Sequence, residues 1–189
     1  MAQKRKDWNG LISGFKASDL VFLDESGCNT DMTRRYAYSL GGSRAVDSAP
    51  LSKPKNTTIL SSIQLDGTLR YTTFSGGTTV ERFKRYLETD LLPHLKGNSV
   101  LIMDNMKSHH AKAVRNLLDS SGVRYIYLPP YSPDLNPIEK LWSKVKAFLR
   151  KFKARTLDAL PNAIQCAFQT VSPSDCSGWF HSCGYSPYF

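Results

Sequence analysis

Two short stretches, Leu20-Val21-Phe22-Leu23-Asp24 and Val100-Leu101-Ile102-Met103-Asp104, decide the fold of this chain. In each, four apolar residues follow one another without alternation, which is typical of a strand buried on both faces of a sheet. Each run ends on an aspartate that polar and small residues follow. Because open α/β sheets place their functional sites at the carboxyl ends of their strands, we expect Asp24 and Asp104 to mark a site there.

The residues between the two runs predict an antiparallel part of the same sheet. Asp66-Gly67 separates two runs rich in β-branched residues, 57–65 and 68–74, and this pattern is a strong hairpin signal. The weak alternation from Arg34 to Tyr38 indicates another short strand. Residues 41–56, with their glycines and prolines, indicate a loop.

The second half of the chain predicts helices and one more strand. Ser108 is expected to cap a helix that Gly122 ends, and residues 123–128 then form a strand, so that the order strand, helix, strand suggests a parallel crossover. Helical periodicity also predicts three segments: 79–92, Pro137 to about Lys153 with Asn136 as its cap, and a last helix from Thr156 to about Val171. Without the weak signal at 34–38 the expected strands number five, and these elements predict an α/β fold with a mixed five-stranded sheet flanked by helices.

Length, composition and charge limit the classes of function. A chain of 189 residues suits one domain, and 41% hydrophobic with 22% charged residues is typical of a globular protein rather than a disordered one. The net charge of +9 favours a polyanionic partner, nucleic acid before a membrane surface. No apolar run reaches the ~18 residues of a membrane span, and the first residues lack the apolar stretch of a secretion signal. We therefore expect a cytoplasmic protein that does not bind membranes.

The helix that follows Pro137 combines a single acid with many bases. Glu139 lies about 120° from the centre of the apolar stripe that includes Leu141 and Val145, near the positive end of the helix dipole. Seven basic residues and no acid follow between Lys140 and Arg155. The candidate DNA contacts among them are Lys140, Lys146, Arg150 and Lys153. Taken alone, this helix is equally explained as a solvated surface.

Asp24, Asp104 and Glu139 together indicate a metal site. If the two strands are neighbours, the three carboxylates meet at one edge of the sheet, where they repel one another unless a cation is present. Hard oxygen ligands of this kind suit Mg²⁺ or Mn²⁺. Two such ions ~4 Å apart would clamp the attacking and leaving oxygens of a phosphodiester, and the basic residues would hold the phosphate backbone.

Three motifs carry a resemblance to a known family. They are Phe22-Leu23-Asp24-Glu25-Ser26-Gly27, Met103-Asp104-Asn105 with His109, and Leu128-Pro129-Pro130-Tyr131-Ser132-Pro133-Asp134-Leu135-Asn136-Pro137-Ile138-Glu139 with Trp142. They resemble the DDE transposases of the mariner-like superfamily, above all its bacterial insertion-sequence branch, which favours the 34 residues that separate Asp104 from Glu139. The resemblance implies an RNase H-like fold. It also implies DNA cutting and joining that depend on Mg²⁺, with Mn²⁺ as a substitute, and a metal-binding triad of Asp24, Asp104 and Glu139.

The same resemblance implies the domain layout and the partners. Residues 1–19 are expected to be a tail or linker and residues 20–189 the catalytic domain. The expected partner is double-stranded DNA, as transposon ends and as target, bound by a homodimer in the nucleoid. Family members carry helix-turn-helix segments ahead of the catalytic domain, and the residues before the first expected core strand leave no room for them. We therefore expect either a separately encoded or frameshift-fused helix-turn-helix region as a further partner, or a truncated copy.

Residues beside the three acids have two interpretations each. Asn105 and His109 either orient a metal ligand or touch a phosphate, or else they make local turn and cap hydrogen bonds. Tyr131 and Ser132 are expected to position the Pro-rich loop and line the DNA path. Glu25 follows Asp24 on the strand, so that its side chain is expected on the opposite side.

Two other functions remain open at this point. One is a catalytically idle DNA-binding remnant of a transposase, which the presence of all three acids argues against without excluding it. The other is a host RNase H-like DNA nuclease, which the Pro-rich string before Glu139 disfavours.

Overall fold

Five strands form one mixed sheet in the order β3-β2-β1-β4-β5 in the computed structural model, which describes residues 2–34, 36–48 and 54–185. β1 pairs antiparallel with β2 and β2 with β3, whereas β1 with β4 and β4 with β5 are parallel. The predicted mixed sheet is therefore confirmed. The strands are β1 (Leu20–Cys28), β2 (Thr57–Gln64), β3 (Leu69–Ser75), β4 (Val100–Met103) and β5 (Arg124–Tyr127).

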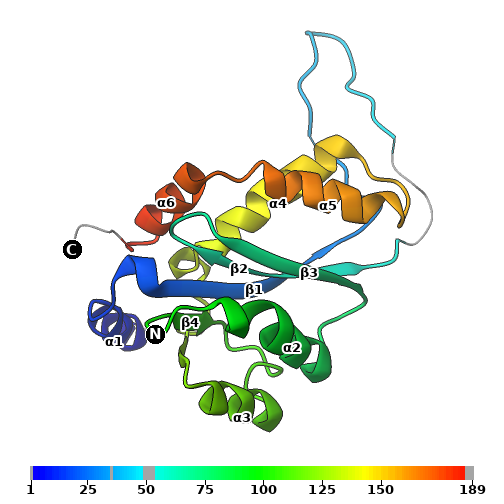
Figure 1. The fold of residues 1–189 in the computed structure, drawn as a ribbon. Helices are drawn as coiled ribbons and strands as arrows, with labels where there is room; N and C mark the ends of the chain where they lie inside the picture. Colours follow the sequence, from blue (N-terminus) through cyan, green and yellow to red (C-terminus); the bar gives the residue numbers. More distant parts are fainter. Residues whose placement is uncertain (1, 35, 49–53, 186–189) are drawn as a thin grey trace.

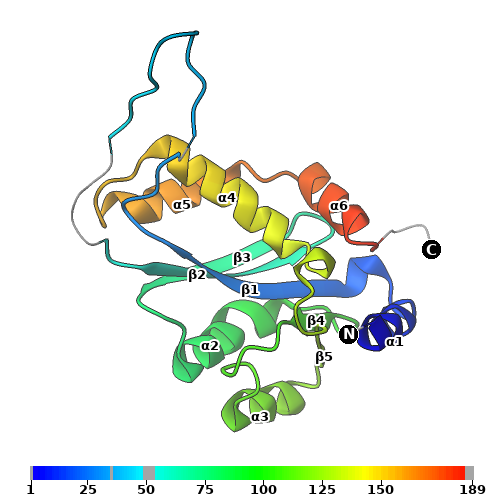
Figure 2. The ribbon, with the colours of Figure 1, turned by 180° about the vertical axis from the view of Figure 1, so that it is seen from behind.

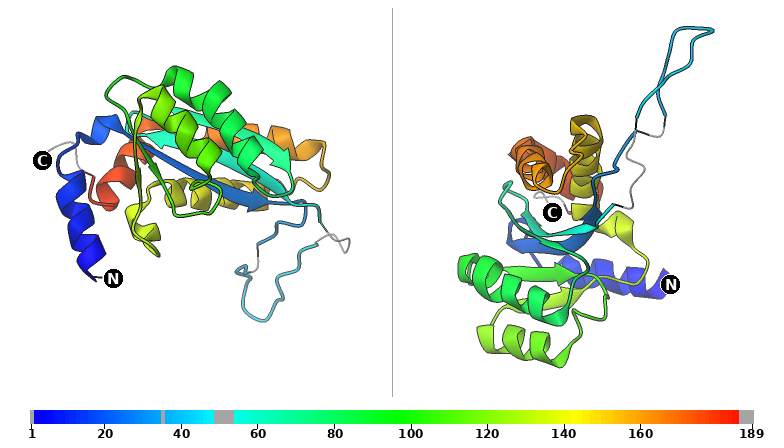
Figure 3. Two further views of the ribbon diagram at one scale, coloured as in Figure 1. Left: turned by 90° about the horizontal axis from the view of Figure 1, so that it is seen from below. Right: turned by 90° about the vertical axis from the view of Figure 1, so that its right-hand side faces the viewer.

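Helices cover both faces of the sheet (Figure 1; Figure 3, right). On one face lie α4 (Ile138–Phe152), α5 (Ala159–Gln169) and α6 (Pro173–Ser182). The other face carries α2 (Val80–Tyr86), which continues through a π-helical turn, η2 (Leu87–Leu91), and a 3₁₀ turn, η3 (Leu92–His94), and α3 (Lys112–Ser121). The remaining elements are α1 (Ala2–Ile12) and the short 3₁₀ turns η1 (Ala17–Asp19) and η4 (Pro133–Leu135).

The side chains of β1 and β4 point alternately into two separate hydrophobic cores. Leu20, Phe22 and Ile102 pack into the core beneath α4, α5 and α6, while Val21 and Leu23 pack into the core beneath α2 and α3. Apolar residues are therefore needed at every position of these strands, which is why the two runs show no alternation.

The register of β1 against β4 sets the position of the two aspartates. Leu23 is the partner of Met103, the last pair of that parallel ladder, so that Asp24 and Asp104 come next on neighbouring strands. Asp104 directly follows β4, as predicted. Asp24 does not end its strand, because β2 continues to pair with β1 as far as Cys28.

Two predictions about local structure are wrong. The described residues of the expected strand 34–38 form no strand, since β2 and β4 already occupy both edges of β1, and Tyr36 and Tyr38 are fully exposed on the loop that projects from the molecule in Figure 1. Arg35 and residues 49–53 of the expected loop lie outside the described residues. Ser108 does not cap α3, whose N-cap is Ala111, because residues 106–109 make a separate turn first.

The C-terminal part differs from the expectation by one additional helix. α5 ends at Gln169, close to the predicted end, but α6 follows it from Pro173. Ser172 and Asp175 form a capping box at its start, which the sequence signals only through a Ser three residues before an Asp. Among the described residues, no helix is both long enough and apolar enough to cross a membrane.

The segment expected to be a tail or linker contains a helix that contacts the core. Trp8 of α1 is 4% exposed and belongs to the core beneath α4, α5 and α6. Helix α1 is therefore held against the sheet by at least one large buried side chain.

Trp8→Ala tests whether α1 is part of the folded unit. Removing a buried Trp side chain costs about 3–5 kcal/mol, so we expect a loss of this order in the free energy of unfolding measured with urea. Leu11→Ala, on the same helix but 47% exposed, is the matched control and should cost well under 1 kcal/mol. Equal stabilities of the two variants would mean that α1 is only a tail.

Candidate active site

One cavity of about 420 Å³ brings the three predicted acids together. Asp24 comes from β1, Asp104 from the end of β4 and Glu139 from the first turn of α4. Figure 2 shows α4 crossing the sheet with its first turn close to β4. The segment that connects β5 to α4 supplies most of the remaining wall: Leu128, Pro129, Pro130, Tyr131, Ser132, Pro133 and Asn136.

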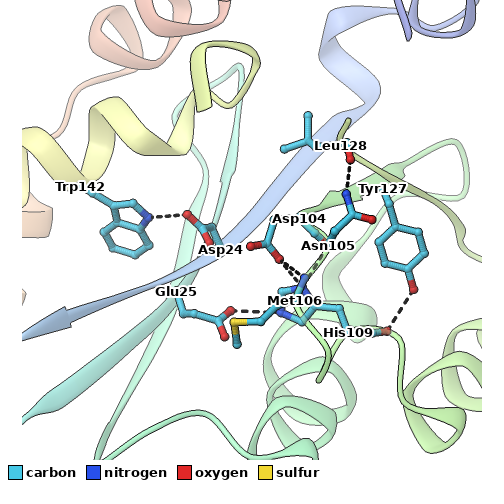
Figure 4. Close-up of polar contacts among 9 residues, drawn as sticks. All are labelled: Asp24, Glu25, Asp104, Asn105, Met106, His109, Tyr127, Leu128 and Trp142. Carbon is cyan, nitrogen blue, oxygen red and sulfur yellow. Dashed lines mark hydrogen bonds and ion pairs between the residues drawn. The ribbon is translucent and has the colours of Figure 1, made fainter. Parts of the chain in front are cut away.

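Asp24 is a buried carboxyl group with one strong donor. Its side chain accepts a hydrogen bond from Trp142 Nε1 at 3.0 Å, and the residue is only 8% exposed (Figure 4). Burial raises the pKa of Asp24 to about 7; the Trp142 hydrogen bond opposes this shift, and the charges of Asp104 and Glu139 add to it. Asp24 therefore keeps a proton more readily than an ordinary carboxyl group, and a cation would compete with that proton.

His109 links Asp104 to a second carboxylate. Its Nδ1 lies 2.8 Å from Asp104 Oδ1 and its Nε2 lies 3.1 Å from Glu25 Oε2 (Figure 4). Its ring also stacks on Phe83, with the ring centroids 4.2 Å apart. The imidazole is fully buried. Burial lowers the pKa of His109, but the two carboxylates outweigh it and raise that pKa to about 9. At neutral pH, His109 is a buried cation between two anions.

Asp104 stays ionised because it is paired with His109. Burial alone would raise its pKa, but hydrogen bonds from His109 and from the Met106 N–H, at 2.9 Å, lower it. Neighbouring carboxylates thus have pKa values shifted in opposite directions, which is typical of functional sites.

Glu25 is the partner of His109 that the sequence did not reveal. Its side chain lies on the side of β1 that faces α2, opposite to Asp24, as the alternation predicted. The pairing itself was missed because 84 residues separate Glu25 from His109. A carboxylate on the α2 side of β1 and a histidine five residues after Asp104 were the available signals.

The predicted supporting residues occupy different positions. Asn105 lines the cavity and its Nδ2 donates to the Leu128 carbonyl, while His109 lies behind Asp104. Ser132 is buried in the cavity wall, and Tyr131 lines it with 85% of the residue exposed and a left-handed backbone (φ 56°). That conformation is uncommon for a non-glycine residue and is found mostly where function constrains the chain.

The predicted DNA contacts are spread along α4 away from the acids. Lys146 and Arg150 line a separate hollow of about 740 Å³ with residues of the 27–36 segment. With a rise of ~1.5 Å per residue, Arg150 lies about 16 Å along the helix from Glu139. Lys140 is exposed beside Glu139, and Lys153, at the end of α4, forms an ion pair with Asp47. The bases therefore extend from the acid cavity rather than surround it.

The donor set of the cavity fits a hard divalent cation. Within residues 2–34, 36–48 and 54–185, no three His, Cys, Asp or Glu side chains converge into a ready-made metal site. Two of the acids instead contact Trp142 and His109. The cavity nevertheless offers three carboxylates and Asn136, whose Oδ1 is buried without a hydrogen-bond partner among the described residues. Oxygen donors of these kinds are those that Mg²⁺ and Mn²⁺ prefer.

Asn136 does not cap α4 as predicted. The N-cap is Pro137, and the Glu139 N–H donates to the main-chain carbonyl of Asn136 at 3.1 Å instead of its side chain. The side chain lines the cavity, which is incompatible with folding back over the first turn of the helix.

The sheet order and the acids at its centre define the class of this protein, an RNase H-like domain with a carboxylate-lined cavity. The model of the DDE superfamily endonuclease family matches residues 19–161, and the chain belongs to this family. It is 30% identical over 97 residues to the Transposable element Tc1 transposase of Caenorhabditis elegans, a stretch that covers 49% of this chain and 36% of that protein.

Solved structures of Mos1 transposase share the fold. A pre-cleavage Mos1 transpososome matches with a TM-score of 0.81 and 20% identity, over 96% of this chain and 58% of that one. The isolated catalytic domain of Mos1 mariner transposase matches with a TM-score of 0.72 and 17% identity, over 95% and 85%. The chain thus spans about a third of the curated relative and little more than half of the Mos1 chain in the transpososome.

The pKa of Asp24 predicts how stability depends on pH. Because its folded pKa is raised from 3.8 to about 7, the stabilising contribution is complete below pH 4 and is lost as pH rises to about 7. Asp24→Asn should remove this loss and at pH 8 should be more stable than the parent, by on the order of 1 kcal/mol or more, since one pKa unit corresponds to about 1.4 kcal/mol.

The measurement is urea unfolding of both proteins between pH 4 and 8 in EDTA. The pKa of His109 is raised from 6.5 to about 9, so its own stabilising contribution falls as pH rises between these two values, and this fall is common to both proteins. Parallel pH curves would refute the raised pKa of Asp24.

Proposed function

We propose that this chain is the catalytic domain of a bacterial insertion-sequence transposase, which cleaves DNA at transposon ends and joins them to target DNA. The observation that carries the proposal is that Asp24, Asp104 and Glu139 line one cavity in a chain of the DDE endonuclease family. Mos1 structures obtained with Mn and with Mg support a divalent cation as cofactor.

In this proposal the three carboxylates hold the cation and their neighbours orient them. A bound Mg²⁺ or Mn²⁺ would stabilise the charge that develops on the attacking and leaving oxygens of the phosphodiester. Trp142 Nε1 fixes the orientation of Asp24, and His109 keeps Asp104 ionised and directed by donating from Nδ1. Asp24 releases the proton that its raised pKa retains. Glu139, exposed in the first turn of α4, would complete the set.

The basic side chains of α4 are the proposed DNA contacts. Lys146, Arg150 and Lys153 follow one another along one side of α4 and its C-cap, and Lys140 lies on another side, next to Glu139. Cations spread over this length can reach several phosphates of a strand. A Mos1 paired-end complex with the left transposon end supports DNA binding by a homodimer. A separately supplied helix-turn-helix region, residence in the nucleoid and the extent of residues 20–189 as the catalytic domain stay predictions.

The two alternative functions have less support. A catalytically idle remnant needs no acid cavity, yet all three acids line this one, and Asp104 keeps an ion pair with the buried His109 ring. No observation on this chain favours a host nuclease over a transposase, and its family and relatives are those of transposition.

Asp104→Asn and Glu139→Gln should each abolish Mg²⁺-dependent nicking of DNA. Both changes remove a charge that holds the cation and keep the side-chain size, so the single-turnover rate should fall at least about 100-fold, in the range seen when one essential electrostatic group is removed. DNA affinity should stay the same or rise as local repulsion falls. Asp134→Asn is the matched control, because Asp134 lies in the turn η4 just before α4 but does not line the cavity, and this variant should cut normally. Full activity of either triad variant would contradict the assignment.

Replacing both Lys146 and Arg150 by Ala should weaken DNA binding for all sequences. The slope of log affinity against log salt should fall by up to about 2, roughly one for each lost phosphate contact. Lys112→Ala with Arg115→Ala removes the same charge from α3, on the other face of the sheet, and should leave the slope nearly unchanged. If the two double variants bind alike, the bases of α4 are only a solvated surface.

A further inference from the structure

Asn136 lines the acid cavity, but its side chain has no structural partner among the described residues. The residue is 4% exposed, and its Oδ1 is buried without a hydrogen-bond donor. An Asn in front of a helix normally accepts from the backbone N–H two or three residues on. Here the main-chain carbonyl of Asn136 accepts from Glu139 instead, so the side-chain oxygen is left over.

A buried amide oxygen without a hydrogen bond lowers the stability of the folded protein. Leaving such a group unsatisfied costs about 1–3 kcal/mol, and native proteins nearly always supply a partner. The titratable groups that share the cavity with Asn136 are the carboxylates Asp24, Asp104 and Glu139, and ionised carboxylates only accept hydrogen bonds. The partner that suits every one of these oxygens is a cation, or a water that a cation holds.

We propose that Asn136 is a fourth oxygen donor for the divalent cation of the acid cavity, contributing a neutral amide oxygen directly or through a water. The inference rests on the proposed function, since it takes the three carboxylates as the charged ligands. Sites for hard cations combine carboxylates with neutral amide and water oxygens. A neutral oxygen adds a donor without adding a fourth charge to three carboxylates that already repel one another. An Asn therefore offers the cation an oxygen that an apolar residue lacks, without the added repulsion among the carboxylates that an acid would bring when no cation is bound.

The position of Asn136 in the chain supports this role. It lies three residues before Glu139, after η4 and immediately before the rigid Pro137, so that one short segment carries both of these cavity-lining residues. Tyr185 donates its hydroxyl to the Leu135 carbonyl at 2.6 Å and fixes the residue next to Asn136. The donor is thus held by the backbone rather than by contacts of its own side chain.

The test is Mn²⁺ affinity, measured by titration calorimetry on the whole chain without DNA. Asn136→Ala should weaken Mn²⁺ binding about 10-fold, the lower end of what supporting groups of metal sites contribute. Asn136→Asp should bind Mn²⁺ more tightly than the parent, because it adds a charge. Asn162→Ala, an exposed amide on α5, is the matched control and should bind as the parent does.

Thermal unfolding in EDTA separates this role from a structural one. Asn136→Ala should be as stable as the parent or more stable, because it removes an unsatisfied buried group. A clear loss of stability would show a structural role and overturn the inference.

The outcomes also distinguish this inference from the proposed function. If Asn136→Ala binds Mn²⁺ like the parent while Glu139→Gln does not, the fourth donor is refuted and the carboxylate site stands. If the parent itself binds no Mn²⁺, the proposed cation site and this inference both fail.

Discussion

The parallel pairing of β1 with β4 places Asp24 beside Asp104, and the rest of the site is arranged around the repulsion between these two carboxylates. The two carboxyl groups have different surroundings. Asp104 is kept ionised by the buried cation His109, whose second nitrogen is held by Glu25. Asp24 faces the apolar core beneath α4 and receives only a neutral donor, Trp142, so its pKa rises. The opposite shifts of the two pKa values reduce the repulsion between neighbouring carboxyl groups, because Asp24 keeps its proton more readily than Asp104 does.

Much of the fold could be predicted because its signals are local. Unbroken apolar runs gave β1 and β4, Asp-Gly gave the hairpin of β2 and β3, and helical periodicity gave α4 and α5. The errors come from tertiary context. Whether Arg34–Tyr38 forms a strand depends on a free sheet edge, and β2 and β4 leave none beside β1. Helix α6 contains Gly178 and weak apolar periodicity, so only its capping box indicated it. Helix α1 is recognised by the burial of Trp8, which no local pattern reveals.

The candidate site, like the fold, could be predicted where its signals are local and not where they depend on tertiary contacts. The three acids were predicted because strand ends and a Pro-rich helix entry are readable along the chain, and the cavity contains all three. Glu25 and Trp142 could not be assigned as partners, since their contacts join residues 84 and 118 positions apart. Asn136 was misread for a related reason. Its local pattern fits a helix cap, and only the three-dimensional position of its side chain, in the wall of the acid cavity, indicates another task.

Helix α4 explains how one element can serve chemistry, stability and binding together. Its apolar stripe is buried through Leu141, Val145 and Leu149, and this packing fixes the helix against the same face of β1 that carries Asp24. Trp142 belongs to that stripe, yet its indole N–H reaches Asp24, so that folding the core also orients a carboxylate. Glu139 and the basic residues lie on the part of the α4 surface that faces away from this core. Since the helix cannot shift without unpacking its stripe, the distance between the acid cavity and the proposed DNA contacts is set by the core itself.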